Sequence, residues 1–482
     1  MKNRPATREV SREEMEKQAY FSRCIAEKNA TFCAEKGRKP LAFVRTFGCQ
    51  MNEHDSEKIA GMLEMMGFAQ GTGFEGADLI VINTCCVREN AEEKVFGHLG
   101  ALKGLKRANP DLIIAVCGCM TEQPHIVEEI RKTYRHVDLV FGTHSLHVMP
   151  ELLWRVIDGK TRVFEVSKTD TEVAENVPVK RVGNVHAWVT IMYGCDNFCT
   201  YCIVPYVRGR ERSRQPAAIV EEIKGLVEAG YKEVTLLGQN VNSYGKDLPE
   251  PVSFAALLDM ICGNTAIERI RFMTSHPKDI SDELIAVMAA RPAVCRQLHL
   301  PVQCGSTNLL RRMNRHYTRE QYLERVRKVR EKMPDVALTT DIIVGFPGET
   351  EEDFEDTLSL VEEVRFDQAY TFIYSRRVGT PAANYPDQVP DDVVKDRFER
   401  LLALQNRISR EINDGFLGAT VDVLCDGFSK TNSERYTGRT EGNKIVNFTA
   451  SRDHTGETVK VKIDSVQTWS LEGAAIEDDG NE

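Results

Sequence analysis

The chain has 482 residues, of which 62 are Lys or Arg and 72 are Asp or Glu, and its formal net charge is −10 at pH 7. Hydrophobic residues make up 42% and aromatic residues 7%, the profile of a globular protein with material for about three domains. This composition excludes a disordered or collagen-like chain. The 14 cysteines are too dilute in a chain of this length for a small disulfide-stapled scaffold.

We expect neither a membrane span nor a secretory signal in this chain. No stretch approaches the roughly 18 consecutive apolar residues that a membrane helix needs, and the charged N-terminus lacks an apolar signal segment. We therefore expect a cytoplasmic protein without a membrane partner. In that reducing compartment cysteines serve metal binding, redox chemistry or packing rather than disulfides, so their spacing is the main question.

The first half of the chain divides into a charged extension and an α/β domain. Residues 1–39 carry a short amphipathic helical pattern, which we interpret as a frayed or docked extension rather than an RNA-contacting arm. From residue 40 to 156, short apolar runs alternate with helical segments, the pattern of βαβ units. We expect a small doubly wound parallel α/β domain with strands at 41–47, 77–83, 111–116 and 137–142.

A polar, linker-like segment leads to two further domains. Residues 181–411 predict a partial (β/α)6 barrel that ends in a long helix over 389–413. Its six expected strands are 187–193, 233–240, 269–275, 296–303, 337–346 and 368–375. Residues 414–477 alternate apolar and polar positions between Gly-containing turns, which predicts a small all-β barrel.

Cys195, Cys199 and Cys202 form a C-x3-C-x2-C motif directly after the first expected barrel strand. Thiolates at this spacing favour iron–sulfur or zinc. Structural zinc is almost always closed by four protein ligands, and no further Cys or His follows at finger-like spacing. Three thiolates on a four-iron cluster leave one iron open for a small molecule. The motif therefore predicts a [4Fe-4S] cluster where barrel chemistry is usually built.

Cys49, Cys85 and Cys119 each follow an expected strand of the N-terminal domain and precede a helix. Loops of this kind meet along the carboxyl edge of a parallel sheet, so the three cysteines can converge. Nearby helix N-termini favour thiolates and an anionic cluster. Buried packing cysteines are the alternative. The neighbouring Cys86 and Cys117 leave the choice of ligands open on spacing alone.

The motif GCDNFCTYC resembles the signature of radical S-adenosylmethionine enzymes. The resemblance implies that S-adenosylmethionine binds the open iron and is cleaved to a 5′-deoxyadenosyl radical, with Tyr201 helping to hold the adenine. It also implies that Gly238, Gln239 and Asn240, at the end of the second barrel strand, bind the methionyl group. Gln303 is a further candidate for contacting the cofactor, although a buried, satisfied glutamine is an equal alternative.

The segments TFGCQMNEHDSE, INTCCVRENAEEKVFGHLG and CGCMTEQ resemble the N-terminal domain of methylthiotransferases. The resemblance implies a second, auxiliary cluster on Cys49, Cys85 and Cys119, with Cys86 and Cys117 as non-ligands. LLGQNVNSYG and CTYCIVPYVRGRERSR are most similar to the branch of this family that acts on N6-dimethylallyladenosine in tRNA. YTGRTEGNKIVNF resembles a TRAM domain, an RNA-binding module. The segment YSRRVGTP departs from the family pattern, which often has proline.

The family implies radical insertion of a methylthio group at C2 of N6-dimethylallyladenosine next to the anticodon (tRNA position 37). Its cofactors would be two [4Fe-4S] clusters and S-adenosylmethionine, which acts as both methyl donor and radical source. The expected partners are the anticodon stem-loop and an electron donor such as flavodoxin or ferredoxin, with the protein a monomer. The sequence identifies no side-chain acid or base. The alternatives are a sister enzyme acting on threonylcarbamoyl-adenosine or a ribosomal-protein aspartate, and a non-catalytic RNA-binding protein with metal sites.

Two groups of residues are candidates for RNA contacts. Alternation in an extended segment would aim Arg208, Arg210, Arg212 and Arg214 the same way, toward phosphates beside the active site. The TRAM-like segment carries more acidic than basic residues, so it would bind RNA through shape and a few placed side chains. The candidates there are Arg439, Asn443, Lys444 and Phe448.

Overall fold

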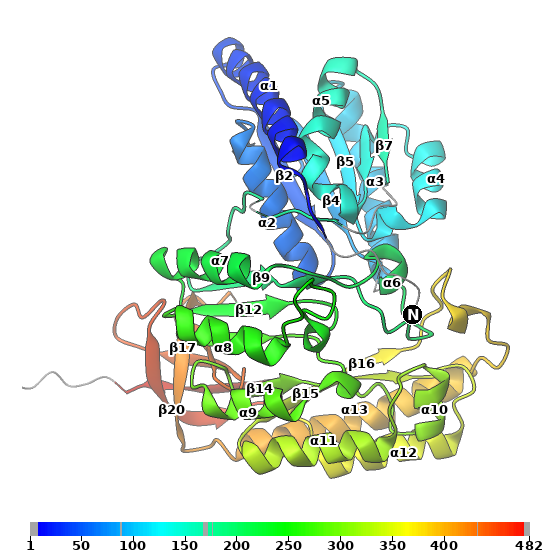
Figure 1. Cartoon of the computed structure of the whole chain (residues 1–482), viewed down its shortest axis with the longest axis vertical. Coiled ribbons are helices and arrows are strands. Elements are labelled where there is room, and N and C mark those ends of the chain that lie inside the picture. The colour runs from blue at the N-terminus through cyan, green and yellow to red at the C-terminus, as the bar shows by residue number, and fades with distance from the viewer. Residues whose placement is uncertain (1–7, 87–88, 167–171, 176, 431, 477–482) are drawn as a thin grey trace, which may run out of the picture.

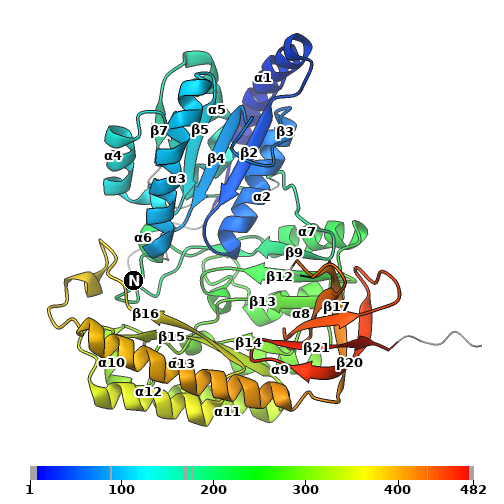
Figure 2. The same cartoon turned by 180° about the vertical axis from the view of Figure 1, so that it is seen from behind.

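The computed structural model describes residues 8–86, 89–166, 172–175, 177–430 and 432–476. This part of the chain forms an N-terminal α/β domain, a central crescent of β/α units and a small C-terminal β-barrel (Figure 1). The α/β domain lies over the β9 and β12 arm of the crescent, and the C-terminal barrel packs at the end where the crescent strands begin (Figures 1 and 2). The predicted fold class is confirmed in all three parts.

The N-terminal domain is built on a parallel six-stranded sheet in the order β3-β2-β4-β5-β6-β7. All six residues of β4 are buried, because helices cover both faces of the sheet. The sheet continues past residue 156 through β7, and the two-residue edge strand β3 was not foreseen. The strands are β2 Leu41–Thr46, β3 Ala69–Gln70, β4 Leu79–Thr84, β5 Ile113–Gly118, β6 Leu139–Phe141 and β7 Val163–Glu165.

Helices cover this sheet on its two faces. One core joins α1, α2 and α5 to the sheet, and a second joins α3 and α4 to the opposite face. The extension forms one continuous helix, α1, whose Ile25 is fully buried against the domain. The helices are α1 Arg12–Lys36, α2 Gln50–Met65, α3 Glu89–Ala108, α4 Pro124–Thr133 and α5 Met149–Gly159, with short turns η1 Met120–Glu122 and η2 Thr143–Val148.

The crescent contains the six expected strands in chain order. They form two parallel sheets, β9-β12-β13 and β14-β15-β16, with a bridge between Ile270 and Val294 where the two meet. Within the described residues β9 and β16 do not pair, so the barrel stays open as predicted. The strands are β9 His186–Thr190, β12 Glu233–Leu237, β13 Arg269–Phe272, β14 Gln297–His299, β15 Ala337–Val344 and β16 Gln368–Ile373.

Helices on the outside of the crescent bury its large apolar core. They are α7 Pro216–Glu228, α8 Phe254–Asn264, α9 Asp282–Ala290, α10 Thr307–Arg312, α11 Arg319–Lys332, α12 Glu351–Val364 and α13 Asp391–Asp414. Two short strand pairs complete the sheets: β1 Arg8–Glu9 with β8 Glu172–Val173, and β10 Met192–Tyr193 with β11 Arg212–Ser213. The remaining short helical elements are α6 Val204–Val207, η3 Val241–Ser243, η4 Pro277–Asp279 and η5 Pro381–Asn384.

The C-terminal strands close into a barrel in the order β17-β18-β19-β21-β20. The turn between β18 and β19 lies under the N-terminal ends of the crescent strands, where Arg271 donates to the backbone oxygens of Thr440 and Glu441, each at 2.7 Å. The strands are β17 Thr420–Phe428, β18 Tyr436–Thr440, β19 Ile445–Thr449, β20 Thr458–Val466 and β21 Ser470–Ala475. In the described part of the chain, no helix is both long and apolar enough to cross a membrane.

Candidate active site

The sheet topology brings the N-terminal cysteines to one edge. Cys49 follows β2, Cys85 follows β4 and Cys119 follows β5, all at the carboxyl ends of neighbouring strands. The chain order of the strands reverses between β2 and β4, and such a switch point is where open α/β sheets bind ligands. Cys49 also stands directly before the first residue of α2. The structure therefore brings together the three cysteines expected on separate loops.

A buried arginine lies among these thiols. The Arg208 Nε donates to Cys119 Sγ at 3.1 Å, and its terminal nitrogen pairs with Asp55 Oδ2 at 2.8 Å. The pKa of Cys49 is lowered to about 6, first by a hydrogen bond with Cys85 and then by the charge of Arg208. The pKa of Cys119 is lowered first by a hydrogen bond with Cys86 and also by Arg208. The site thus favours thiolates.

Cys86 and Cys117, which made the choice of cluster ligands ambiguous, have different surroundings. Cys117 is buried in the core on one face of the sheet, and burial raises the pKa of its thiol. Cys86 is buried against Cys119, together with Ile203 and Val207. Cys117 is thus a packing residue, whereas Cys86 borders the site.

The second triad lies in the loop that follows β10. Gly194 begins this loop with φ +74°, and a Cβ there would meet the Arg210 carbonyl oxygen at 2.0 Å, so only glycine fits. Arg315 is buried and donates to Cys199 Sγ at 3.3 Å. Burial raises the pKa of Cys195, and raises that of Cys202 to about 12.

The donor sets fit iron–sulfur clusters better than single ions. Among the described residues, no three Cys, His, Asp or Glu side chains are grouped so that they could hold one metal ion. Zinc needs its ligands to converge on a single point. In a four-iron cube each thiolate binds a different iron, so the three sulfurs stand apart around the cluster. Each triad supplies three thiols, and one buried arginine donates to a thiol of each.

One short segment connects the two triads. Ile203 and Val207, directly after Cys202, pack on Cys86 and Cys119 of the N-terminal domain. The Thr143 hydroxyl donates to the Val207 carbonyl at 3.1 Å, which fixes α6 under the domain (Figure 1). The segment that begins directly after Cys202 of one triad therefore packs against Cys119 of the other. We call this region, at the carboxyl ends of the crescent strands, the mouth of the crescent.

The residues expected to bind S-adenosylmethionine lie at this mouth with different roles. The Tyr201 ring is partly buried, and its centroid lies 6.5 Å from that of the Phe346 ring. A Cβ on Gly238 would meet Met192 Cγ at 2.6 Å, so the backbone packs closely there. Gln303 has φ +73°, a strained conformation for a non-glycine residue, as occurs at ligand sites. These three positions remain candidates for cofactor contact.

The side chains of Gln239 and Asn240 differ in their hydrogen-bond partners. Gln239 Oε1 is buried without a hydrogen-bond partner. Asn240 is buried and fully engaged: its amide donates to Asp279 at 2.8 Å, and its Oδ1 accepts from the His276 backbone at 3.2 Å. Gln239 is thus available to a ligand, whereas Asn240 holds the adjacent loop.

Sequence reasoning missed His276 and Asn242, which lie beside Gln239 in two hydrogen-bonded loops. His276 Nδ1 accepts from the Lys278 backbone N–H at 3.3 Å, so in the neutral ring the proton sits on Nε2. Burial holds the pKa of His276 far below its usual value, which keeps the ring neutral. His276 Nε2 and Asn242 Nδ2 are both buried without partners. The two unpartnered donors, on His276 and Asn242, could bind a carboxylate, and the unpartnered acceptor on Gln239 could bind an ammonium group.

The predicted stripe of four arginines is wrong as a common exposed surface. Arg208 is 4% exposed and occupied by Cys119 and Asp55. Arg212 is buried and donates to His144 of the N-terminal domain at 3.2 Å. Arg214 pairs with Glu175 and Glu222 at 2.6 and 2.7 Å. Only the Arg210 side chain is largely exposed, at 55%, over the Phe198 ring. The segment turns through α6 and β11 and is not uniformly extended, so alternation does not apply.

The TRAM-segment candidates do not form an RNA-binding face either. Phe448 is fully buried in the core of the small barrel. Lys444 pairs with Asp367 of the crescent at 2.9 Å. Arg439 donates to Asn443 Oδ1 at 3.0 Å, and Asn443 has φ +66° in the turn that packs under the crescent. The inward positions of β19, visible in its alternation, could have identified Phe448 as core.

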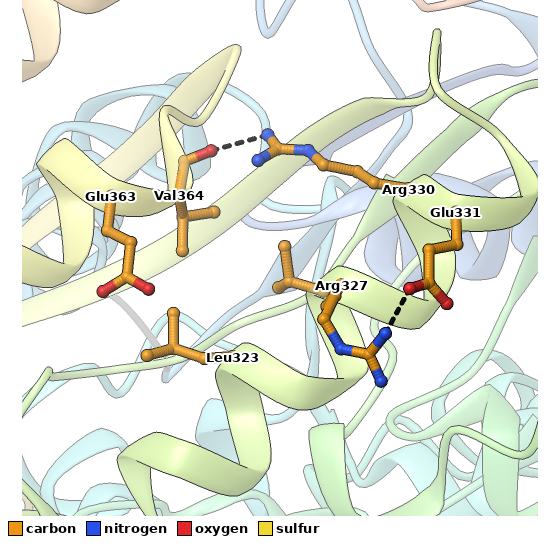
Figure 3. Close-up of a pocket in the computed structure, with 7 residues that line it drawn as sticks. Leu323, Arg327, Arg330, Glu331, Glu363 and Val364 are labelled. Atoms are coloured by element: carbon orange, nitrogen blue, oxygen red, sulfur yellow. Dashed lines mark hydrogen bonds and ion pairs between the residues drawn. The ribbon is translucent and has the colours of Figure 1, made fainter.

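A separate groove lies between α11 and α12 on the outer surface of the crescent (Figure 3). Leu323 and Val364 line it, with the Arg327–Glu331 ion pair and the bond from Arg330 to the Val364 carbonyl along its sides. No cysteine lines it, and both helices lie on the opposite side of the strands from the crescent interior. It is not part of the site at the mouth.

Comparisons with known proteins agree with this architecture. Residues 189–361 match the Radical SAM superfamily, residues 42–142 match Uncharacterized protein family UPF0004, and residues 416–476 match the TRAM domain. Among solved structures, the radical S-adenosylmethionine methyltransferase TsrM from Kitasatospora setae, with cobalamin and a [4Fe-4S] cluster bound, has a TM-score of 0.53. That match covers 80% of this chain and 81% of TsrM at 16% identity, and it supports the fold alone.

Curated relatives match over almost their whole length. The tRNA-2-methylthio-N(6)-dimethylallyladenosine synthase of Acetivibrio thermocellus is 60% identical over 467 residues, 97% of each chain. The protein of the same name from Clostridioides difficile is 54% identical over 96% of this chain and 97% of its own. With these relatives and the three domain matches, the chain belongs to the family of radical S-adenosylmethionine methylthiotransferases named tRNA-2-methylthio-N(6)-dimethylallyladenosine synthase.

Proposed function

We propose that this enzyme replaces the C2 hydrogen of N6-dimethylallyladenosine with a methylthio group, in tRNA immediately 3′ of the anticodon. The observation that carries the proposal is the pair of cysteine triads facing one mouth, joined by the segment from Cys202 to Arg208. Two centres are needed because one keeps an open iron while the other yields sulfur. When bound, the two clusters and S-adenosylmethionine supply the electron, the sulfur, the methyl group and the radical that removes the hydrogen.

Each triad would hold one [4Fe-4S] cluster. We assign Cys195, Cys199 and Cys202 to the cluster with the open iron, and Cys49, Cys85 and Cys119 to the auxiliary cluster. The buried Arg315 and Arg208 each donate to a thiol of one triad, which offsets the anionic charge of the thiolates.

The methionyl group of S-adenosylmethionine would bind in the loops after β12 and β13. Gln239 Oε1 would accept from its ammonium group, and His276 Nε2 and Asn242 Nδ2 would donate to its carboxylate. Tyr201, Gly238 and Gln303 would border the rest of the cofactor. Asn240 would position His276 through the hydrogen bond to its backbone.

Apolar side chains at the open edge of the crescent suit the substrate base and its dimethylallyl group. Tyr370, Phe372 and Ile373 of β16 are at least 40% exposed, and Val378 in the following loop is 68% exposed. Single aromatic residues at such a mouth stack on unpaired bases. Arg210, exposed beside the triad of the crescent, is the one residue of the predicted arginine stripe that we retain as a phosphate contact.

We place the reaction in the cytoplasm, with a monomeric enzyme reduced by a small carrier such as flavodoxin or ferredoxin. The decisive experiment incubates the reconstituted protein, reductant and S-adenosylmethionine with anticodon stem-loops bearing dimethylallyl-adenosine, threonylcarbamoyl-adenosine or unmodified adenosine. Mass spectrometry of the nucleosides should find the methylthio product on the first substrate only. Product on the threonylcarbamoyl substrate instead would assign the chain to the sister activity.

A further inference from the structure

Arg208 belongs to one domain and serves the cysteine site of the other. It follows α6 in the crescent, six residues after Cys202, yet its Nε donates to Cys119 Sγ at 3.1 Å. Its terminal nitrogen reaches Asp55 Oδ2 at 2.8 Å, and a weaker contact joins it to Asn52 Oδ1 at 3.5 Å. The residue is 4% exposed. A guanidinium so deeply buried is costly unless its charge is matched on site.

Two charged side chains, Arg208 and its ion-pair partner Asp55, lie beside the thiols of this triad. Asp55 offsets the single charge of Arg208, which leaves the anionic charge of three thiolates to the cluster. Hydrogen bonds and nearby charge are the features through which a protein sets the reduction potential of an iron–sulfur cluster. A positive charge stabilises the reduced, more negative form and therefore raises the potential.

We propose that Arg208 is a positioning residue of the auxiliary cluster: reaching Cys119 from the neighbouring domain, it retains that cluster and raises its reduction potential. The inference rests on the auxiliary cluster proposed above. It also explains why the crescent contacts the triad directly. Arg208 can reach Cys119 only when the two domains are docked, so the reduction potential of the auxiliary cluster depends on that docking.

A purely structural role for Arg208 makes a different prediction. If Arg208 and Asp55 only joined the domains, removing either side chain would loosen the interface and change the solvent exposure of the cluster in the same direction. If Arg208 acts through its charge, the two substitutions act oppositely, since Arg208→Gln removes a positive charge and Asp55→Asn removes a negative one.

The test is a redox titration of the auxiliary cluster in the full-length protein, followed by electron paramagnetic resonance. The background carries alanine at Cys195, Cys199 and Cys202, so that only the auxiliary cluster is present. Arg208→Gln should lower the reduction equilibrium constant at least tenfold, a shift of about 59 mV to more negative potential. Asp55→Asn should shift the potential the opposite way, and Arg208→Lys should stay close to the parent. Arg315→Gln, which removes the arginine at the other triad, should leave the potential unchanged.

Iron and sulfide analysis of the same samples gives the second readout. Arg208→Gln should lose auxiliary iron faster on exposure to a chelator than Arg208→Lys. Equal potentials and equal iron release in Arg208→Gln and the parent would overturn the inference, as would shifts of the same sign in Arg208→Gln and Asp55→Asn. If Arg208→Gln does not fold, the sign of the shift in Asp55→Asn decides: a shift to more positive potential supports the inference, and a shift to more negative potential overturns it. A parent without iron on this triad would instead refute the second cluster of the proposed function.

Discussion

At the scale of single residues, the polar atoms left without partners say most about the site. Gln239, Asn242 and His276 each have a buried atom with no partner, within two loops that are otherwise tied together by hydrogen bonds. Buried polar atoms are nearly always satisfied in folded proteins, so these three atoms are candidates for contact with a ligand. Gln239 was a candidate from its motif, whereas nothing in the sequence distinguished His276 from a histidine in any loop.

Replacing Gln239 with Leu should weaken the binding of S-adenosylmethionine about tenfold or more. A hydrogen bond to a charged group contributes roughly 1.5–3 kcal/mol, and about 1.4 kcal/mol corresponds to a factor of ten in affinity. Equilibrium dialysis with the reconstituted protein measures it. Gln70→Leu, at an exposed position in β3, is the matched control and should bind normally. Unchanged affinity in Gln239→Leu would remove this residue from the cofactor site.

A second residue-scale prediction concerns the ion pair at the base of the crescent. Arg271 Nε lies 2.9 Å from Glu233 Oε2, and both side chains are buried. Arg271→Met should lower the free energy of unfolding by about 3–5 kcal/mol, because it leaves a carboxylate buried without its partner. The double variant Arg271→Met, Glu233→Leu should recover most of that loss in urea titrations. A double variant as unstable as the single one would show that the backbone contacts of Arg271 dominate instead.

At the scale of elements, the N-terminal extension is part of the first domain. Helix α1 packs along α5, Ile25 enters the core below α2, and Lys17 pairs with Glu151 at 2.7 Å. The sequence suggested only a short helix, because apolar residues at helical spacing are few along its length. The helix is held by tertiary contacts more than by its own pattern.

Ile25→Ala should destabilise the N-terminal domain by about 2–5 kcal/mol, as expected for a fully buried aliphatic side chain. Tyr20→Ala on the same helix is the control, since Tyr20 is 56% exposed, and its effect should stay within about 0.5 kcal/mol. Urea unfolding of the two variants compares them directly. Equal destabilisation would mean that α1 is not docked through Ile25 in solution.

At the scale of the whole molecule, the C-terminal barrel packs where the crescent strands begin, and the N-terminal domain lies over the β9 and β12 arm (Figures 1 and 2). The β18–β19 turn and Lys444 hold the base, while α6 and Arg208 hold the mouth. One contact at the base depends on pH: His186 Nδ1 lies 3.7 Å from Asp426 Oδ1 of the small barrel. The ion-pair interaction with the Asp426 carboxylate raises the pKa of His186 above its ordinary value of 6.5.

A raised pKa means that the folded state binds the proton more tightly than the unfolded chain. The stabilisation by His186 is therefore complete below pH 6.5 and disappears as the pH rises through the higher folded pKa. We expect the difference in melting temperature between the parent and His186→Gln to shrink from pH 5.5 to pH 8. Asp426→Asn should remove this pH dependence. A difference that stays constant with pH would exclude the pair as its cause.

The three-part architecture is predictable from the sequence alone and is confirmed by the structure, whereas the role of the six cysteines as cluster ligands stays a prediction. Periodicity and turn residues identify parallel strands such as 77–83 and the β/α units of the crescent, because local patterns reflect burial on one or two faces. The motif C-x3-C-x2-C is compact, and three loops of a parallel sheet must share an edge, but the choice of Cys85 and Cys119 over Cys86 and Cys117 came from the family resemblance.

The roles of the charged residues, in contrast, depend on contacts between distant parts of the chain. Arg208, Arg212 and Arg214 read as a solvent-facing stripe, yet their partners come from residues far away in sequence, such as Cys119, His144 and Glu175. Phe448 and Lys444 likewise became core and interface residues once strand register and domain docking were known. Pairing between distant segments depends on how the domains pack, and that information is not present in any local stretch of chain.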